Sequence, residues 1–223
     1  MKKKTCKLYY FSVEGETEKW YLEHLQKLIN NTEEIPFKIK LDIEINKSIT
    51  SRMKNIVTVS KNTKAFHLCD YESNQEIHVK QFEKVLEELK NSKKINSNIN
   101  YKLGYSNFTF DLWIILHKTQ KKGAVTDREK YLAGINKAYN ENFQSMKEYK
   151  EEKNFKKILA QITLEDIIKA IKNGNEIRQR NIKDFKEKYR QFGKFEYYMQ
   201  NPDMTINECI EQILQEIGVL KQK

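Results

Sequence analysis

The clearest pattern in the chain is a strict alternation of apolar and polar residues over positions 37–45. A period of two predicts a strand with one buried face and one face in water. An apolar and aromatic run at 7–13 predicts a strand, and a second apolar run at 65–69 is too short for a globular helix and predicts a buried strand. Positions 101–105 predict a further short strand. The first half of the chain therefore contains four candidate strands.

Segments with apolar residues at helical spacing separate these strands. They cover positions 20–28 and 76–90, and a short helix is expected over 51–60. Thr17 is a plausible N-cap for the first helix, and Gly15 supplies backbone freedom to the turn before it. Because strands alternate with helices, we expect an α/β fold with a mainly parallel sheet covered by helices.

The sequence changes character after an apolar, helix-like segment at 108–117. Positions 121–223 are rich in lysine and glutamate and contain no convincing alternating strand. Apolar stripes at helical spacing, over 158–171 and 206–217, indicate helices instead. We therefore expect an α/β core over residues 1–120 and a helical C-terminal portion, residues 121–223, packed on that core.

Composition narrows the class of protein only modestly. Of the 223 residues, 39% are apolar and 32% charged, which is sufficient for a folded core. No apolar stretch has the length of a membrane span and no secretory leader is recognisable, so we expect a cytoplasmic protein without a membrane partner. Three scattered cysteines predict buried thiols rather than a disulfide framework or a zinc site.

A net charge of +10 points toward a polyanionic partner such as nucleic acid. The most suggestive basic stretch covers positions 178–194, where basic and aromatic residues are mixed as on surfaces that contact phosphates and stack bases. The alternative is an amphipathic helix with a buried apolar stripe over 182–192 and a solvated basic face. The candidate nucleic-acid-binding residues are Arg178, Arg180, Lys183, Lys186 and Arg190.

Acidic residues follow two of the predicted strands, with Glu14 after the first and Asp70 and Glu72 after the run at 65–69. If these strands are parallel neighbours, their carboxyl ends meet at one edge of the sheet. In an extended segment, residues two apart point to the same side, so Asp70 and Glu72 would face one crevice. Carboxylates are the ligands that Mg²⁺ prefers, and Glu14 could be a ligand or a general acid/base. The alternative is a solvated acidic loop or a helix cap.

Four further residues are candidates to contact the substrate or to support the metal ligands. Asn107 ends a predicted strand, while Asp111 and His117 lie on the apolar helix that follows. For His117, a partly buried histidine bonded to the backbone is an equally good interpretation. Glu18 could join the metal site or simply complement the helix dipole.

Four segments of the chain stand out as motifs. They are Val-Glu-Gly-Glu-Thr-Glu-Lys-Trp-Tyr at 13–21, Leu-Cys-Asp-Tyr-Glu at 68–72, Tyr-Ser-Asn-Phe-Thr-Phe-Asp-Leu-Trp-Ile-Ile-Leu-His at 105–117 and Asn-Pro-Asp-Met-Thr at 201–205. In this order and spacing they resemble the signature blocks of the RloB-like proteins, which include the AbiLii-type abortive-infection proteins. The chain departs from the family pattern at two positions, because Glu72 replaces the more usual aspartate and Phe108 follows Ser-Asn where the family has proline.

This resemblance implies a Toprim-like, Rossmannoid fold, in which a glutamate after the first strand and an Asp-x-Asp pair after a later strand bind Mg²⁺ or Mn²⁺. Glu14 matches that glutamate, and Asp70 with Glu72 matches the pair. The resemblance further implies a nuclease that is the effector of a prokaryotic anti-phage system. RNA, with tRNA as a candidate, is the expected substrate in preference to DNA. An ATPase subunit of the RloA or AbiLi kind would be its partner.

The alternative function is a non-catalytic nucleic-acid-binding or regulatory subunit that docks on the ATPase. A homodimer is compatible with the sequence.

Overall fold

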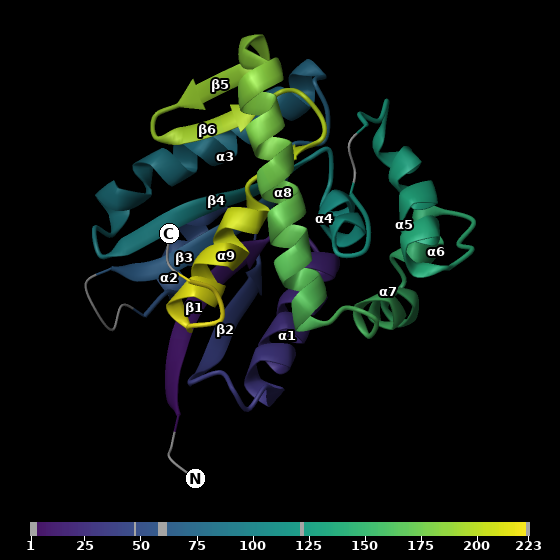
Figure 1. The fold of residues 1–223 in the computed structure, drawn as a ribbon. Coiled ribbons are helices and arrows are strands. Elements are labelled where there is room, and N and C mark those ends of the chain that lie inside the picture. Colours follow the sequence, from purple (N-terminus) through teal and green to yellow (C-terminus); the bar gives the residue numbers. More distant parts are fainter. Residues whose placement is uncertain (1–3, 47, 58–61, 121–122, 222–223) are drawn as a thin grey trace.

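A five-stranded sheet forms the centre of the molecule (Figure 1). The strands lie in the order β2-β1-β3-β4-β7; the first four are parallel, and β7 pairs antiparallel with β4. The predicted α/β fold with a mainly parallel sheet is therefore confirmed. The strands are β1 (Thr5–Val13), β2 (Phe37–Ile45), β3 (Thr63–Asp70), β4 (Ile99–Asn107) and β7 (Asp203–Met204). The computed structural model describes residues 4–46, 48–57, 62–120 and 123–221.

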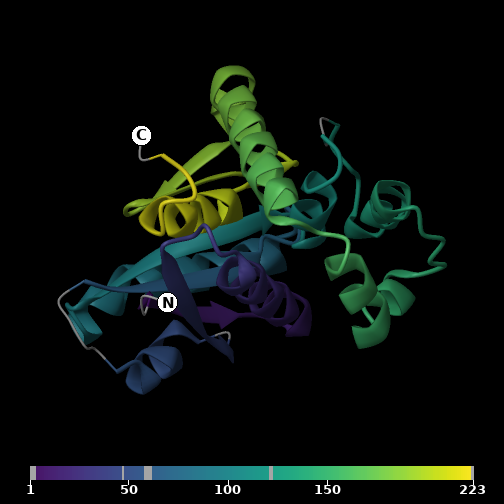
Figure 2. The ribbon, with the colours of Figure 1, turned by 60° about the horizontal axis from the view of Figure 1, so that its bottom comes forward.

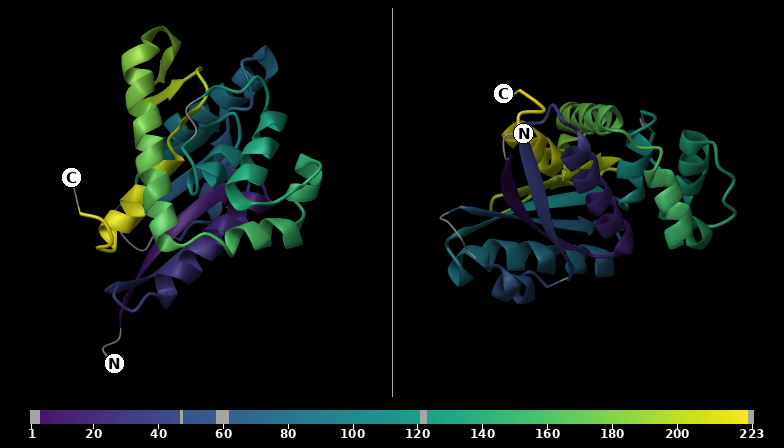
Figure 3. Two further views of the ribbon diagram at one scale, coloured as in Figure 1. Left: turned by 45° about the vertical axis from the view of Figure 1, so that its right-hand side comes forward. Right: turned by 90° about the horizontal axis from the view of Figure 1, so that it is seen from below.

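Helices cover both faces of this sheet (Figures 2 and 3). Helices α2 and α3 pack on one face, and α1 and α9 pack on the other, with α8 against α9. Helices α5, α6 and α7 form a group beside α4 and α1 (Figure 1). The helices are α1 (Glu16–Asn31), α2 (Ile49–Asn55), α3 (Glu76–Ile95), α4 (Asp111–Leu116), α5 (Tyr131–Tyr139), α6 (Met146–Tyr149), α7 (Glu152–Leu159), α8 (Leu164–Asp184) and α9 (Ile206–Glu216).

The helical layers on both faces of the sheet explain why the apolar run in β3 is continuous, whereas apolar and polar residues alternate in β2. In β3, Phe66 and Leu68 enter the hydrophobic cluster on the α1 side, while Ala65 and Cys69 enter the one on the α3 side. A strand that is buried on both faces must be apolar throughout. Strand β2 is at the edge of the sheet and keeps one wetter face, as its alternation predicted. Burial thus places β1 and β3 at the centre, and their carboxyl ends carry the acidic residues.

The C-terminal half is largely helical, as predicted, but it also contains short strands that the sequence analysis missed. The expected helical stripe over 182–192 is wrong, because α8 ends at Asp184 and Ile182 is 51% exposed. A hairpin of β5 (Tyr189–Phe192) and β6 (Phe195–Tyr198) follows. Gly193 lies in its turn with φ of 59°, a left-handed conformation that glycine adopts without strain.

Several local boundaries also differ from the sequence predictions. Helix α1 begins at Glu16 with Gly15 at the N-cap, so Thr17 lies inside the first turn and does not cap it. The helix expected over 51–60 is α2, which begins at Ile49; positions 58–60 lie outside the described residues. The apolar helix expected over 108–117 shortens to α4.

The structure also bears on two predictions from composition, the burial of the cysteines and the lack of a membrane span. Cys69 and Cys209 are buried free thiols, as expected, whereas Cys6 is exposed. Across the described ranges, none of the helices combines the length and the apolar character needed to cross a membrane.

Candidate functional site

Glu14 and Asp70 meet at the carboxyl edge of the sheet. Strands β1 and β3 are parallel neighbours, paired through Tyr10–Ser12 and Ala65–His67. Glu14 directly follows β1, and Asp70 is the last residue of β3. The backbone N–H of Asp70 donates to Oε2 of Glu14 at 3.0 Å. The parallel pairing therefore brings together two acids that are far apart in sequence, as the strand-end argument expected.

A cavity of about 320 Å³ opens at this edge, and Glu14, Asp70 and Glu72 all line it. The expectation that Asp70 and Glu72 extend from one strand is wrong, because β3 ends at Asp70 and Glu72 adopts a left-handed φ of 60°. Oε2 of Glu72 lies 3.1 Å from Nε2 of His78 on α3. Glu72 thus reaches the cavity through a turn and faces its α3 wall.

The left-handed backbone of Glu72 leads to a stability prediction. We expect Glu72→Gly to be more stable than Glu72→Ala by about 1 kcal/mol, because only glycine adopts this φ without strain. Both variants lose the carboxylate and its contact with His78, so the pair isolates the backbone effect. Urea unfolding measures the difference; equal stabilities would show that the residue is not held in this conformation.

A second group of charged side chains lies beside Asp70. It consists of Glu18, in the first turn of α1, Asp111, the first residue of α4, and Lys150, which directly follows α6. Glu18 is 6% exposed and Asp111 only 1%. Nζ of Lys150 lies 3.0 Å from Oδ2 of Asp111, which also accepts a hydrogen bond from the Thr109 hydroxyl at 2.8 Å.

Excess negative charge dominates the electrostatics of this edge. Burial, followed by the carboxylates of Glu18 and Glu14, raises the pKa of Asp70 well above its usual value. Burial also raises the pKa of Glu18. Lys150 lowers both carboxyl pKa values; its own pKa is raised because Asp111, Asp70 and Glu18 outweigh the effect of burial. One ammonium group faces several carboxylates.

Glu14 and Asp70 offer two carboxylates to a divalent cation at the cavity. Within the described ranges, no three acidic, histidine or cysteine side chains are grouped closely enough to hold an ion as they stand. Mg²⁺, however, is often held by one or two carboxylates and several waters. Glu14 and Asp70 can serve as those carboxylates, and Asp70 also carries unfavourable charge that a cation relieves. Glu72 can join them if it turns away from His78.

Close beside Glu14, Gly15 leaves room for Glu18. Gly15 has a φ of −152°, which is extended backbone that any residue adopts. The prediction that this turn requires the conformational freedom of glycine is therefore wrong. A Cβ at this position would instead lie 3.2 Å from Oε2 of Glu18. Glycine therefore matters for the close approach of that carboxylate to the chain.

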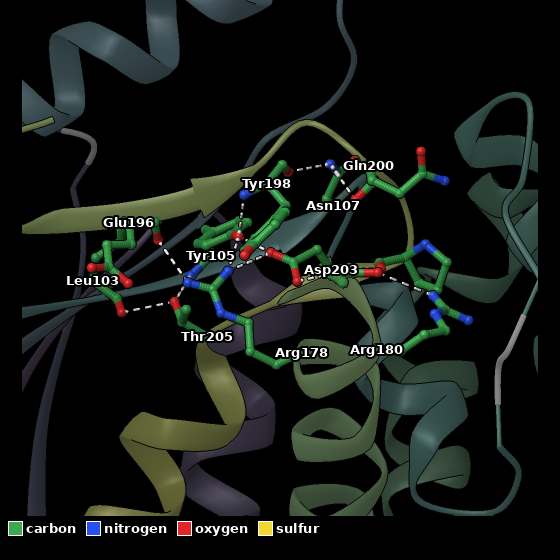
Figure 4. A network of polar contacts seen from close by, with 12 residues as sticks. Leu103, Tyr105, Asn107, Arg178, Arg180, Glu196, Tyr198, Gln200, Asp203 and Thr205 are labelled. Atoms are coloured by element: carbon green, nitrogen blue, oxygen red, sulfur yellow. Dashed lines mark hydrogen bonds and ion pairs between the residues drawn. The ribbon is translucent and has the colours of Figure 1, made fainter. Parts of the chain in front are cut away.

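Asn107 and His117 have structural contacts and do not line the cavity. The amide of Asn107 donates to the carbonyls of Tyr198 and Gln200, at 3.1 and 3.3 Å, and so ties the hairpin to the end of β4 (Figure 4). His117 is fully buried between the Trp113 carbonyl and the Tyr21 hydroxyl, and burial lowers its pKa to about 4. It therefore stays neutral, which matches the structural interpretation rather than the substrate contact.

Arg178 is part of an internal network instead of a basic face (Figure 4). Its Nη1 lies 2.8 Å from Oδ2 of Asp203, which is fully buried, and 3.0 Å from the Tyr105 hydroxyl. Nη2 donates to the carbonyl of Glu196. The expectation that Arg178 contacts nucleic acid is therefore corrected, because its guanidinium compensates a buried carboxylate.

The remaining basic candidates differ in exposure. Arg180 is partly buried, and its Nη2 donates to the side chain of Asn181 at 3.4 Å. Lys183, Lys186 and Arg190 are exposed around the end of α8 and the start of the hairpin. These three side chains therefore remain candidates to contact nucleic acid.

The hairpin lies against the loop that follows Asp70. The rings of Tyr71 and Tyr197 have centroids 6.0 Å apart, and the Asn74 amide donates to the Met199 carbonyl at 3.4 Å. Arg190 lies near enough to lower the pKa of Tyr71, although burial raises it overall to about 12. The hairpin thus carries basic charge close to the cavity.

Lys150 and His78 are the site residues that sequence reasoning missed. His78 offered a weak signal, since it lies near the start of the helix that follows the acidic strand end. It lines the cavity, and its ring nitrogens contact Ser73 Oγ and Glu72. Lys150 offered none, because it is one of many lysines in a Lys/Glu-rich segment.

Comparison with known proteins identifies one family. The model described as "RloB-like protein" matches residues 9–213, which is most of the chain. No curated protein and no solved structure matches the chain. The matched region includes both the acidic strand ends and the segment that contains Lys150.

Proposed function

The chain belongs to the RloB-like family, and from this premise we propose that it is a Toprim-like, Mg²⁺- or Mn²⁺-dependent nuclease. In this proposal it cleaves RNA, with tRNA as the first candidate substrate and DNA as the second. It acts as the effector of a prokaryotic anti-phage abortive-infection system together with an ATPase subunit. The choice of RNA and of the ATPase partner rests on the family resemblance.

One observation carries the proposal of a metal-dependent reaction. Asp70 is held beside Glu14 and Glu18 at the carboxyl edge of the sheet, although burial and these carboxylates disfavour its charged form. Such an arrangement lowers stability unless a cation completes it, and strained charges of this kind cluster at functional sites. A bound Mg²⁺ would polarise a phosphodiester and lower the pKa of an attacking water.

The chain's own residues supply the other requirements of hydrolysis. Glu14 and Asp70 would hold the cation, with Asp70 fixed by the Phe110 N–H, which donates to its Oδ1 at 2.8 Å. Glu72 and His78 face each other on the cavity wall, with Oε2 of Glu72 3.1 Å from Nε2 of His78, where they would orient a bound substrate. In this proposal, the exposed side chains of Lys183, Lys186 and Arg190 would contact the phosphates of a bound strand.

The experiment is a cleavage assay with purified protein, total tRNA and plasmid DNA, in Mg²⁺ or Mn²⁺ and with the ATPase subunit present or absent. We expect wild-type protein to cleave one polymer and Glu14→Gln to lose that activity. Glu16→Gln is the matched control, since its carboxylate is exposed, lies two residues away and pairs only loosely with Lys19 at 3.6 Å. Cleavage that survives in Glu14→Gln, or that needs no metal, would contradict the proposal.

A second function is favoured by one observation. Glu72 faces His78, and the described residues contain no ready group of three metal-binding side chains. A regulatory subunit that docks on the ATPase without cleaving nucleic acid would have this property. Wild-type protein that binds the ATPase stably but cleaves neither polymer in its presence would establish this alternative.

A further inference from the structure

The carboxylates around Asp70 fall into two sets with different surroundings. Glu14 and Glu72 line the cavity together with Asp70. Glu18 and Asp111 are almost completely buried and do not line it. The pKa of Asp70 is raised by a member of each set, by Glu18 and Asp111 of the buried set and by Glu14 of the cavity set.

The second set already has its cation. The ammonium group of Lys150 contacts Oδ2 of Asp111 at 3.0 Å, and its charge acts on both Asp70 and Glu18. A lysine side chain is positively charged at neutral pH, and the contact with Asp111 pairs this charge with a buried carboxylate. Oδ1 of Asp111 is buried and has no hydrogen-bond partner in the described part of the chain.

Packing holds Lys150 in this place. Tyr149, the residue before it, is fully buried and its ring packs against Phe155 and Phe143. Lys150 therefore follows an anchored residue at the end of α6, and its side chain remains 39% exposed. A lysine side chain that is only partly buried can be reached by a phosphate oxygen of a bound substrate.

We propose that Lys150 is a tethered cation that takes the place of a second metal ion, so that this site holds a single divalent ion on the side of Glu14. The inference rests on the proposed function, because it concerns the same metal site. In two-metal sites, paired ions stabilise the attacking and leaving oxygens of a phosphodiester. A lysine can supply one of these charges, since its ammonium is a compact phosphate-binding cation.

Charge repulsion and occupancy of the ligands both favour this arrangement. A divalent ion between Asp70, Glu18 and Asp111 would compete with the ammonium for the same oxygens and would be repelled by it. On the other side of Asp70, Glu14 and Asp70 line a cavity in which a hydrated ion has space. Lys150 thus determines both the number of ions and the side on which the ion binds.

The test counts Mn²⁺ ions bound per chain by isothermal titration calorimetry of the full chain. We expect one ion for wild-type protein and two for Lys150→Met, in which Asp111 and Glu18 become available. Lys147→Met is the matched control, because this lysine is exposed on the same short helix; it should bind one ion. Lys150→Arg keeps the charge and should also bind one.

The outcomes separate the inference from the proposed function. Two ions bound by wild-type protein would overturn the inference while supporting the metal site, and this result needs no variant to fold. One ion in both wild-type and Lys150→Met would also overturn the inference alone. No Mn²⁺ binding by wild-type protein would overturn the metal site and the inference together.

Discussion

Replacing Asp70 by asparagine is expected to reduce metal-dependent cleavage by about 100-fold or more and, at the same time, to stabilise the metal-free protein. The loss of activity follows from the loss of a ligand carboxylate, which contributes several kcal/mol through the bound ion. The gain in stability follows from removal of a charge that burial, Glu18 and Glu14 oppose. Asparagine retains an oxygen that can accept from the Phe110 N–H.

The raised pKa of Asp70 determines whether its replacement raises or lowers the free energy of unfolding. The pKa of Asp70 is raised in the folded protein, so between its ordinary value and the raised one the folded state holds a proton that the unfolded state has released. Wild-type stability therefore falls as the pH rises through this window, and Asp70→Asn should fall less. At neutral pH we expect a gain of about 1 kcal/mol, measured by urea unfolding in EDTA.

Asp184→Asn is the control for this experiment, because Asp184 is exposed at the end of α8. Its stability should follow that of wild-type protein at every pH. If Asp70→Asn were less stable than wild-type protein at neutral pH, the carboxylate would be favourably placed without a metal, contrary to the argument above.

The second large effect is expected from the network around Arg178. Arg178→Met should destabilise the protein by about 3–5 kcal/mol, because it leaves a buried carboxylate, Asp203, without its cation. Asp203 also accepts hydrogen bonds from the Tyr105 hydroxyl and from the Asn181 amide, which alone cannot compensate the charge. Thermal and urea unfolding measure the loss.

Two further variants show whether the charge pair is responsible. Lys183→Met, on an exposed position of the same helix, should change stability by less than about 0.5 kcal/mol. The double variant Arg178→Met/Asp203→Asn should recover part of the loss, since the buried charge has gone. An Arg178→Met protein as stable as Lys183→Met would show that Asp203 does not depend on the arginine.

The surroundings of Arg178 could not be predicted from the sequence. A mixture of arginines, lysines and aromatic residues over 178–194 describes a basic surface and a buried amphipathic helix equally well. The structure contains neither in pure form: α8 stops at Asp184, Arg178 points inward to Asp203, and a hairpin follows. Gly193 was the local signal for the turn, but its meaning depended on the partner strand.

The direction of the Glu72 side chain could not be predicted from its spacing to Asp70. Spacing of two residues places side chains on the same side only while the chain is extended, and the strand ends at Asp70. The left-handed backbone at Glu72 redirects its carboxylate toward His78, yet the residue still lines the cavity. The residue was assigned to the right region through reasoning that was wrong in geometry.

The sequence by itself determined the α/β class, the wetter face of β2, the buried character of β3, and the positions of Glu14 and Asp70 at strand ends, which meet because the two strands are parallel neighbours. These properties follow from the period of apolar residues and from the positions where strands end. Both features can be recognised within short segments of the sequence. Only the tertiary structure decided that Lys150 forms an ion pair with Asp111 and that Arg178 forms one with Asp203. Such pairings depend on which distant elements pack together and on the cost of burying a charge without a partner, and no local pattern encodes either of these.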